Sequence, residues 1–284
     1  MKWFKSPSKD VLGINERNLN WVYTRNPRKH FDLANDKVLT KQILIAAGIP
    51  VTDQLGTIGR IGEIEEKWAQ IPKRDCAIKP AHGSGGGGIL VVQYGSGGWT
   101  KGGKSISEAE IRKHIANIVF GVFSFGSDDV ALIEEKIVPH SAITAIYSEG
   151  VADLRVIVCD GKAVMAMLRI PTARSQGKAN LHQGAIGIGI DMATGKTTTA
   201  FTGSEYLHIH PDSKHPLTDV EVPFWTQCID IALATAAAFP LNYLGIDIAF
   251  DEYKGPLVLE INVRPGLEIQ NVNRQGLKSV LPKS

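Results

Sequence analysis

Apolar residues along the chain recur with two periods, and each period predicts a different kind of element. From residue 36 the apolar positions follow the spacing of an amphipathic helix, which ends at Gly48, just before Pro50. Further helices are expected over residues 61–70, from about residue 107, and over residues 224–238. Strands are expected at residues 76–79, 88–93, 130–133, 154–159, 164–170, 245–250 and 257–263. Strands interrupted by separate helices favour an α+β fold over a regularly alternating parallel sheet.

Proline, asparagine and glycine residues divide the chain into segments. Pro7, Asn26 and Pro27 interrupt any long helix before residue 36, and the glycine-rich stretch at residues 94–104 predicts a flexible loop. The expected organisation is an N-terminal arm or partial lobe at 1–36 and a main domain at 37–284, with a small lid subdomain at roughly 55–133 and a larger subdomain at roughly 134–284.

Composition places the chain among ordinary globular proteins. Its 284 residues, 43% of them hydrophobic and 21% charged, suffice for a sizeable core. No apolar run reaches the ~20 residues that cross a bilayer, and the first residues lack the apolar stretch of a signal peptide, so a cytoplasmic location is expected. A formal net charge of +2 gives no reason to expect nucleic acid as a partner, and the oligomeric state is left open.

A lysine followed by a glycine-rich loop joins two of the predicted strands. Lys79 ends the first strand, and the sequence Pro-Ala-His-Gly-Ser-Gly-Gly-Gly-Gly leads into the second. Glycine lets backbone N–H groups approach phosphate oxygens closely and adopts positive φ, so such a loop is typical of phosphate binding. The alternative is a flexible glycine loop beside a surface lysine.

This loop differs from three common nucleotide-binding motifs. Gly83, Gly85 and Gly88 match G-x-G-x-x-G, but a strand is predicted after Gly88, whereas a dinucleotide-binding turn opens a helix. The sequence lacks the Gly-Lys-Ser/Thr ending of a P-loop and the later HRD and DFG sequences of a protein kinase. A strand-loop-strand flap preceded by a lysine remains.

Two carboxylates and an amide come together on the last two predicted strands. If the turn at residues 251–256 is centred symmetrically, Asp247 lies opposite Glu260, and the period of two places Asn262 on the same face as Glu260. An unpaired carboxylate among apolar neighbours is costly, so a divalent cation is a natural partner. Oxygen ligands favour Mg²⁺, with Mn²⁺ as an alternative, and nucleotide phosphates would complete the coordination. The other interpretation is that these side chains face solvent on an exposed side of the hairpin.

Arg155 and Arg169 lie on neighbouring predicted strands. A short hairpin through Asp160 and Gly161 is nearly symmetric about the pair and would direct both guanidiniums into one cleft. There they could bind a phosphate or a carboxylate with two hydrogen bonds each and stabilise charge during transfer. Ordinary surface arginines are the alternative.

Two further segments carry candidate binding groups. A long loop contains Arg174, Lys178, Asn180 and His182, and long loops are common places for binding residues. Glu134 and Glu135 follow an apolar run, where either a strand leaving a nucleotide pocket or a solvated acidic pair fits.

The histidine-rich segment and the cysteines are interpreted as structural. The segment HIHPDSKH at 208–215 offers neither a thiolate nor an H-E-x-x-H context, so a zinc site is not expected there. Cys76, Cys159 and Cys228 are odd in number and far apart, which argues against disulfides and against a thiolate zinc site.

Taken in chain order, these segments resemble the ATP-grasp superfamily, and the later half is similar to the RimK-type α-L-glutamate ligases. The matching stretches are DKVLTKQILIAAGIPV, AIKPAHGSGGGGI, LIEEKIV, DLRVIV, LRI with NLHQGA, and GIDIAF with LVLEINVRPGLE. They cover most of residues 36–268, and several motifs in the same order are more specific than any one of them. The resemblance implies an ATP-grasp fold, in which two α+β subdomains grip ATP.

The resemblance also implies roles for particular residues. ATP contacts are expected from Lys37, Lys79, His82, Gly83, Ser84, Gly85, Gly86, Gly87, Gly88, Glu134, Glu135, Lys136, Ile137 and Val138. Among these, the two lysines would contact phosphates and residues 135–138 would form the adenine hinge. The expected magnesium ligands are Asp247, Glu260 and Asn262. The expected catalytic residues, near the transferring phosphate or the acceptor carboxylate, are Arg155, Arg169 and Asn180.

The activity that the resemblance implies is ATP-dependent ligation of a carboxylate to an amine. The carboxylate would attack the γ-phosphate of Mg-ATP to give an acylphosphate, and an amine would capture this intermediate as an amide. Glutamate or another amino acid would be added to a peptide or a small amine. A phosphotransferase and a non-catalytic ATP-binding regulatory module are the alternatives. Val263-Arg264 departs from the family pattern, because a small Ala-Ser type pair is usual there, and it adds a cation beside the expected site.

Overall fold

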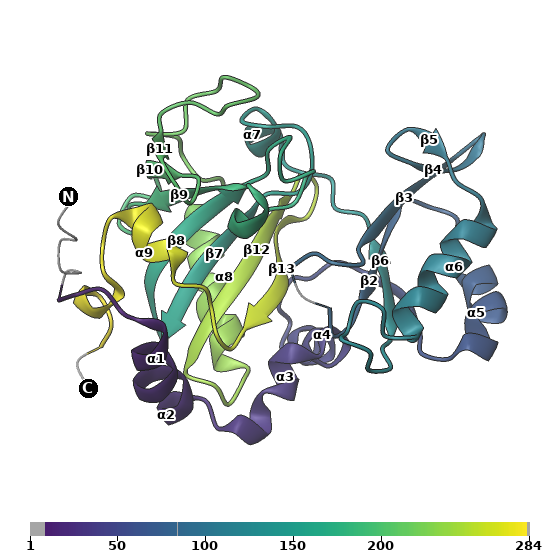
Figure 1. Cartoon of the computed structure of the whole chain (residues 1–284), viewed down its shortest axis with the longest axis horizontal. Helices are drawn as coiled ribbons and strands as arrows, with labels where there is room; N and C mark the ends of the chain where they lie inside the picture. The colour runs from purple at the N-terminus through teal and green to yellow at the C-terminus, as the bar shows by residue number, and fades with distance from the viewer. Residues whose placement is uncertain (1–8, 84, 283–284) are drawn as a thin grey trace, which may run out of the picture. The chain divides into compact units, whose positions relative to one another are not determined.

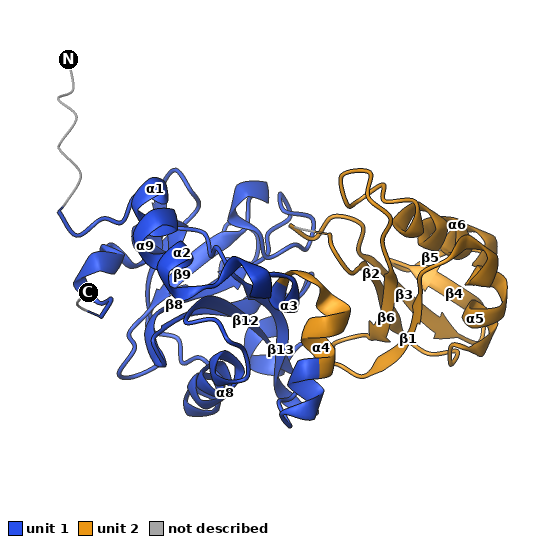
Figure 2. Ribbon diagram, turned by 90° about the horizontal axis from the view of Figure 1, so that it is seen from below, with its two compact units in different colours: residues 1–34, 43–50, 138–284 blue, residues 35–42, 51–137 orange. Residues whose placement is uncertain are grey.

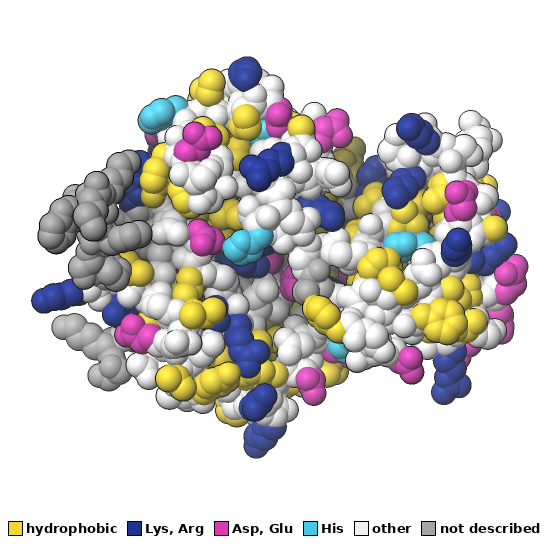
Figure 3. Space-filling model, in the orientation of Figure 1, with side chains coloured by type: hydrophobic (Ala, Val, Ile, Leu, Met, Phe, Trp, Pro, Cys, Tyr) yellow, Lys and Arg dark blue, Asp and Glu magenta, His cyan; other side chains and the backbone are white. Residues whose placement is uncertain are grey.

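The computed structural model describes residues 9–83 and 85–282, and the chain divides into two compact units (Figure 2). Unit 1 comprises residues 1–34, 43–50 and 138–284, and unit 2 comprises residues 35–42 and 51–137. Across the two described ranges, no helix combines the length and the apolar character needed to cross a bilayer. The face in Figure 3 mixes basic and acidic side chains, in keeping with the small net charge.

Unit 2 is built on a six-stranded sheet of antiparallel pairs, in the order β1-β6-β2-β3-β4-β5. The strands are β1 (Gln54–Ile58), β2 (Cys76–Pro80), β3 (Leu90–Gly95), β4 (Gly98–Lys101), β5 (Lys104–Ser105) and β6 (Ala131–Glu135). The helical elements are α4 (Lys37–Ala46), which begins in this unit, η3 (Ile61–Glu63), α5 (Ile64–Gln70) and α6 (Glu108–Val119).

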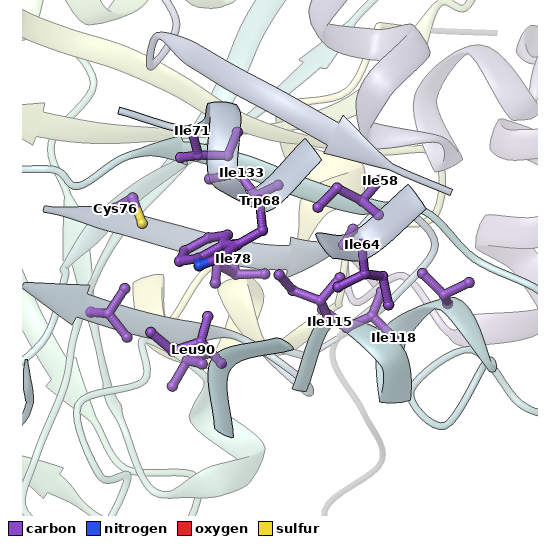
Figure 4. Packing of buried hydrophobic residues seen from close by; sticks show 14 of the residues in the cluster. Ile58, Ile64, Trp68, Ile71, Cys76, Ile78, Leu90, Ile115, Ile118 and Ile133 are labelled. Atoms are coloured by element: carbon purple, nitrogen blue, oxygen red, sulfur yellow. The ribbon is translucent and has the colours of Figure 1, made fainter. Parts of the chain in front are cut away.

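One face of this sheet packs against α5 and α6 and forms the core of unit 2 (Figure 4). Ile78 and Ile133 from the sheet meet Trp68 from α5 and Ile115 from α6, and all four side chains are buried. Successive residues of a strand point to opposite faces, so Lys79 lies on the other side of the sheet from Ile78. The apolar core therefore fixes the face on which the lysine of the glycine loop stands.

Two sequence expectations for unit 2 have different outcomes. The predicted helix from about residue 107 is confirmed, because Ser107 caps α6 in a reciprocal capping box with Glu110. The flexible loop predicted at residues 94–104 is wrong, since β4 and β5 occupy much of it. Trp99 explains the difference. It is 5% exposed, and its ring centroid lies 5.5 Å from that of Trp68. This packing holds the chain around Trp99 extended between glycine turns.

Unit 1 contains a seven-stranded sheet in the order β11-β10-β9-β8-β7-β12-β13. The strands are β7 (Asp153–Cys159), β8 (Lys162–Ile170), β9 (Ile186–Ile190), β10 (Thr197–Phe201), β11 (Tyr206–Leu207), β12 (Tyr243–Asp251) and β13 (Gly255–Asn262). The longer helices are α8 (Trp225–Ala237) and α9 (Glu268–Asn273). Short helical segments are α1 (Ile14–Glu16), η1 (Arg17–Val22), α2 (Tyr23–Arg25), η2 (Arg28–His30), α3 (Asp32–Asn35), α7 (Ser141–Thr144), η4 (Leu181–Gln183) and η5 (Leu277–Ser279).

Helices α8 and α9 cover opposite faces of the sheet in unit 1, as Figures 1 and 2 show. Close approach of α9 requires glycine on β9, because a Cβ at Gly187 would lie 2.6 Å from a methyl carbon of Val272. Gly187 pairs with Arg169 on β8, so α9 and the Arg169 side chain share one face. The opposite face, under α8, carries buried aliphatic residues such as Ile246 and Ile248.

The N-terminal segment is tied into unit 1 by buried polar side chains. Residues 14–25 are helical without a break, through α1, η1 and α2. Asn26, 1% exposed, donates from Nδ2 to Tyr243 O at 2.7 Å and accepts from the backbone N–H groups of Asn242 and Tyr243. Arg17 donates to Pro265 O at 2.8 Å. These bonds attach the segment to the start of β12 and to the chain that follows β13.

The β12–β13 hairpin pairs the two carboxylates as the sequence predicted, but its turn and its register differ from the symmetric hairpin that was expected. Asp247 pairs with Glu260, as expected. The turn is one residue tighter than the symmetric one, because Asp251 pairs with Gly255. The register then shifts between Asp247 and Ile248, which leaves Leu259 as the extra residue of a bulge. The bulge moves Glu260 back opposite Asp247.

Candidate functional site

Five polar side chains gather on one face of the sheet in unit 1: Asp153, Arg155, Arg169, Asp247 and Asn262. Arg155 binds Asp247 with two hydrogen bonds, from Nε at 2.7 Å and from Nη2 at 2.6 Å. Arg169 donates to the same carboxylate at 2.8 Å and to Asp153 at 2.5 Å. Asn262 Nδ2 donates to Asp247 Oδ2 at 3.1 Å. The two arginines thus meet at one carboxylate, although the register of the hairpin pairs Arg155 with Met167 and Arg169 with Asp153.

The charges of this cluster set the protonation of its members. Burial by itself raises the pKa of Asp247, but attraction to Arg155 and Arg169 outweighs it and holds the pKa below its ordinary value. For Asp153 burial prevails over Arg169 and raises the pKa to about 6. Asp247 is therefore ionised at neutral pH, and the guanidiniums face a lasting negative charge.

Asp247, Glu260 and Asn262 bring three oxygen-bearing side chains to paired positions of one hairpin. Asp247 and Glu260 are direct partners, and Asn262 is two residues further along the same strand face. Two carboxylates and an amide oxygen suit Mg²⁺ or Mn²⁺, with phosphate and water as the remaining ligands. The described ranges hold no group of three or more His, Cys, Asp or Glu residues with metal-binding geometry. A metal at this hairpin would consequently depend on the amide of Asn262 and on a ligand from outside the chain.

Asn180 and Arg264 have local roles in unit 1. Asn180 Oδ1 accepts from His182 N at 3.0 Å and begins the short helix η4. The Arg264 guanidinium lies 5.1 Å from the Phe31 ring and 5.6 Å from the Tyr23 ring. The cation that departs from the family pattern is thus held by aromatic rings of the N-terminal segment.

Unit 2 gathers two lysines at one buried carboxylate. Lys41 forms an ion pair with Oε1 of Glu134, and Lys79 forms one with Oε2. Lys41 also donates to Thr52 O at 2.5 Å and to Thr52 Oγ1 at 2.8 Å. Burial by itself raises the pKa of Glu134, but the two lysines outweigh it and lower the pKa to about 2. The carboxylate of Glu134, expected near ATP, is therefore ionised and bound to the lysines.

The sheet face around Lys79 is partly apolar and exposed. Ala77, two residues before Lys79 on β2, pairs with Val91 on β3, and Val91 is 41% exposed. An exposed aliphatic side chain beside a lysine and a glycine loop is a combination that suits a nucleotide, whose base is flat and whose phosphates are charged.

The chain entering the glycine loop is held from two sides. Lys37 donates from its backbone N to Ala81 O at 3.2 Å and from Nζ to Gly83 O at 2.6 Å. On the other side, Asp129 accepts from His82 N at 3.1 Å, and its Oδ1 lies 2.8 Å from His82 Nδ1. The first turn of the loop is therefore anchored to α4 and to the segment before β6.

The end of the glycine loop is anchored separately. Positive φ angles occur at Gly85, Gly86 and Gly88. Gly88 O lies 2.8 Å from His114 Nε2, and a Cβ at Gly88 would come within 2.5 Å of the Phe123 ring. Gly87 lies in the turn between these anchors, and Ser84, another expected ATP contact, lies outside the described residues.

The four residues expected to form an adenine hinge lie at and after the end of β6: Glu135, Lys136, Ile137 and Val138. In unit 2, Glu135 N donates to Asp53 O at 3.0 Å, and Lys136 Nζ pairs with Asp75 at 3.0 Å. In unit 1, Val138 N donates to Asp251 Oδ2 at 2.9 Å, and its side chain is 41% exposed. The segment is thus fixed at both ends by hydrogen bonds.

Buried histidine and cysteine side chains have structural environments. His210 is fully buried, with Nε2 2.9 Å from Pro171 O and Nδ1 accepting from Asp212 N at 3.2 Å, so both ring nitrogens are used within the protein. The cysteines are buried free thiols, and burial raises the pKa of each to about 12: Cys76, Cys159 and Cys228. These thiols are poor nucleophiles and poor metal ligands at neutral pH.

Three charged residues of these clusters were missed by sequence reasoning: Lys41, Asp129 and Asp153. Lys41 follows Lys37 by one helical turn, and Asp153 precedes Arg155 by two strand positions, so periodicity could have found both. Asp129 carries no such signal, because its partner His82 is 47 residues away in the chain.

Comparison with known proteins gives a family match over nearly the whole chain. The family described as sugar-transfer associated ATP-grasp matches residues 16–283. A probable alpha-L-glutamate ligase of Haemophilus influenzae is 26% identical over 250 residues, which are 87% of this chain and 61% of the relative. The chain therefore spans about three fifths of the length of this curated relative.

Solved structures share the fold. A biotin carboxylase of Campylobacter jejuni matches with a TM-score of 0.58 and 15% identity over 95% of this chain and 52% of its own. The VanG D-Ala:D-Ser ligase of Enterococcus faecalis matches with a TM-score of 0.50 and 14% identity over 87% of this chain and 60% of its own. The expected α+β ATP-grasp fold is confirmed.

Proposed function

Because this chain belongs to the sugar-transfer associated ATP-grasp family, we propose that it uses Mg-ATP to join a carboxylate to an amine. The observation that carries the proposal is the hairpin that sets Asp247 opposite Glu260, with Asn262 beside them. Arg155 and Arg169 lie on the same sheet face and bind Asp247 directly. Charged groups of both signs on one rigid sheet suit the transfer of a phosphoryl group.

The proposed reaction has two steps. A carboxylate oxygen of the first substrate attacks the γ-phosphorus of ATP, the bond from this phosphorus to the bridging oxygen breaks, and ADP leaves. The amine nitrogen of the second substrate then attacks the acyl carbon, phosphate leaves, and the nitrogen releases a proton. The products are an amide, ADP and phosphate.

Each cluster has a separate part in this proposal. Asp247, Glu260 and Asn262 would hold Mg²⁺, which neutralises phosphate charge and orients the oxygens. Arg155 and Arg169 stabilise the negative charge that develops during transfer. In this proposal the sheet of unit 1 holds the charged groups in fixed positions around the phosphoryl group that is transferred.

In unit 2, Lys37 and Lys79 are proposed to bind the phosphates, together with the backbone of the glycine loop. We propose further nucleotide contacts from His82, from Gly83 to Gly88 and from the hinge at residues 135–138. Asn180 is proposed to contact the transferring phosphate. The named relative is a probable alpha-L-glutamate ligase, so glutamate is the first candidate for an amino-acid substrate.

Replacement of Glu260 by glutamine tests the proposal. The assay measures magnesium-dependent ADP release by the whole chain against a panel of amino acids and peptides, with mass spectrometry to detect an amide. Glu260→Gln should abolish ADP release with an unchanged circular dichroism spectrum, because one metal ligand loses its charge. The matched control is Glu205→Gln, an exposed glutamate of the same unit, which should retain full activity.

Other outcomes of this assay would point elsewhere. ADP formed with a phosphorylated product and no amide, even when an amine is supplied, would indicate a phosphotransferase. No ADP release with any acceptor would indicate an ATP-binding regulatory module. Full activity of Glu260→Gln would exclude the metal assignment.

A further inference from the structure

The ion-pair cluster in unit 2 contains one more cation than it has carboxylates. Lys41 and Lys79 share Glu134, one at each carboxylate oxygen. The Lys41 side chain is 6% exposed and that of Glu134 is 4% exposed, whereas that of Lys79 is 17% exposed. The cluster therefore has a buried end at Lys41 and a more open end at Lys79, which stands beside the glycine loop.

Lys41 cannot itself bind a ligand in this arrangement. An ammonium group has three N–H donors, and Lys41 directs them to Glu134 Oε1, Thr52 O and Thr52 Oγ1. Both Thr52 acceptors are uncharged, so Glu134 is the main counter-charge of Lys41, and Asp53 adds a smaller attraction. Within the described part of the chain, Lys79 contacts a single acceptor, Glu134 Oε2.

The charge of the cluster depends on the ionisation of Glu134 and of Lys41. Burial lowers the pKa of Lys41, and attraction to Glu134 opposes this shift. Burial by itself raises the pKa of Glu134, but the lysines lower it to about 2, so the carboxylate stays ionised at physiological pH. With both lysines protonated, the cluster carries a net charge of +1. Without Lys41, Glu134 and Lys79 would form a neutral pair, and Lys79 would have no excess charge to offer an anion.

We propose that Lys41 is a positioning residue that neutralises Glu134 and thereby leaves Lys79 as the surplus cation for the phosphates of a nucleotide. The inference rests on the proposed nucleotide site and adds a determinant of its specificity. A site with this surplus charge binds a nucleoside diphosphate or triphosphate in preference to the uncharged nucleoside. Lys41 acts through Glu134 and Lys79, and it touches no substrate.

The test measures binding of ADP and of adenosine to the whole chain by calorimetry at constant ionic strength. Lys41→Met should weaken ADP binding roughly tenfold or more, because one charge is lost within several ångströms of the phosphates in a partly buried site. Adenosine binding should change by less than about twofold, since its charge is zero. Lys67→Met, which removes an exposed lysine of the same unit, is the matched control and should leave both affinities unchanged.

A double variant separates this electrostatic role from simple support of the fold. In Lys41→Met with Glu134→Gln, the carboxylate that Lys41 neutralises is also gone, so Lys79 again has surplus charge and ADP affinity should return to within about threefold of the wild type. Glu134→Gln alone should bind ADP at least as tightly as the wild type. Glu134→Gln leaves the buried Lys41 without its carboxylate, whereas the double variant removes both buried charges and keeps the inference testable if either single variant does not fold.

Several results would overturn the inference. Unchanged ADP affinity in Lys41→Met, equal losses for ADP and adenosine, or no recovery in the double variant would each contradict it. So would weaker ADP binding by Glu134→Gln alone. The proposed nucleotide site is tested separately by Lys79→Met, and if that variant binds ADP like the wild type, the site and the inference both fail.

Discussion

Asp247 is the buried centre of the arginine cluster, and its replacement by asparagine should destabilise the protein strongly. The Asp247 side chain is 3% exposed, and its carboxylate accepts hydrogen bonds from Arg155 and Arg169 at 2.6–2.8 Å. Asp247→Asn keeps the size of the side chain but removes its charge. Among the ion pairs that the described residues form in this cluster, only that of Arg169 with Asp153 then remains, and Arg155 loses its carboxylate partner.

The expected cost follows from the burial of this cluster. Removing one partner of a buried ion pair costs about 3–5 kcal/mol, because the remaining charge stays buried without compensation. The asparagine Oδ1 can still accept one of the hydrogen bonds, so we expect the lower end of this range, about 3 kcal/mol. For a chain of this size, such a loss lowers Tm by roughly 6–12 °C.

Urea and thermal unfolding at neutral pH, without nucleotide or metal, measure this effect. The control is Asp160→Asn, which makes the same substitution in an exposed pair with Arg25 at 2.9 Å and should cost less than about 1 kcal/mol. The reasoning is refuted if Asp247→Asn lies within about 1 kcal/mol of the wild type or is no less stable than the control.

The effect should depend on pH in a defined direction. Burial by itself raises the pKa of Asp247, but the arginines hold the folded-state pKa below that of the unfolded chain. A group of this kind stabilises the fold above its unfolded pKa of about 3.9, and the stabilisation is lost as pH falls through the folded pKa. The difference between wild type and Asp247→Asn should therefore be present at neutral pH and shrink below about pH 4. A difference that grows in acid would contradict this assignment.

Two further substitutions test the N-terminal anchor and the glycine loop. Asn26→Ala should cost about 3 kcal/mol in urea unfolding, because buried backbone groups at the start of β12 lose their partner, whereas Asn20→Ala, at an exposed position, should be nearly neutral. Equal stabilities of the two variants would exclude the anchor. Gly88→Ala should raise the KM for ATP roughly tenfold or more, because the new methyl group collides with Phe123 and displaces the loop. Gly95→Ala, where a Cβ meets nothing within 4 Å, is the control, and a normal KM in Gly88→Ala would mean that the loop does not hold the nucleotide.

Local patterns predicted most of the strands that carry the candidate site. Apolar runs and alternation indicated β2, β3, β7, β8, β12 and β13, and the period of two brought Asp247 and Glu260 to paired positions. The route to that pairing was not predictable, because the turn is tighter and a bulge at Leu259 compensates for it. The bulge lets Val258 and Ile261 both be buried on the α8 side of the sheet. Because the bulge depends on this packing, the hydrophobic pattern of the sequence does not predict it.

Strand and helix positions follow from neighbours in the chain, because alternation, capping and turn chemistry act over a few residues. Which charges meet depends instead on how distant segments pack. Lys41 reaches Glu134, Asp129 reaches His82, and Arg264 stacks on Phe31 across long stretches of chain. Lys41, Glu134 and Asp129 are buried, which removes the alternative of hydration, so these three charges need partners that only the assembled fold brings within reach. The sequence by itself thus determined which chemical groups the strands of the candidate site carry. Only the tertiary structure decided which of the charged groups pair with one another.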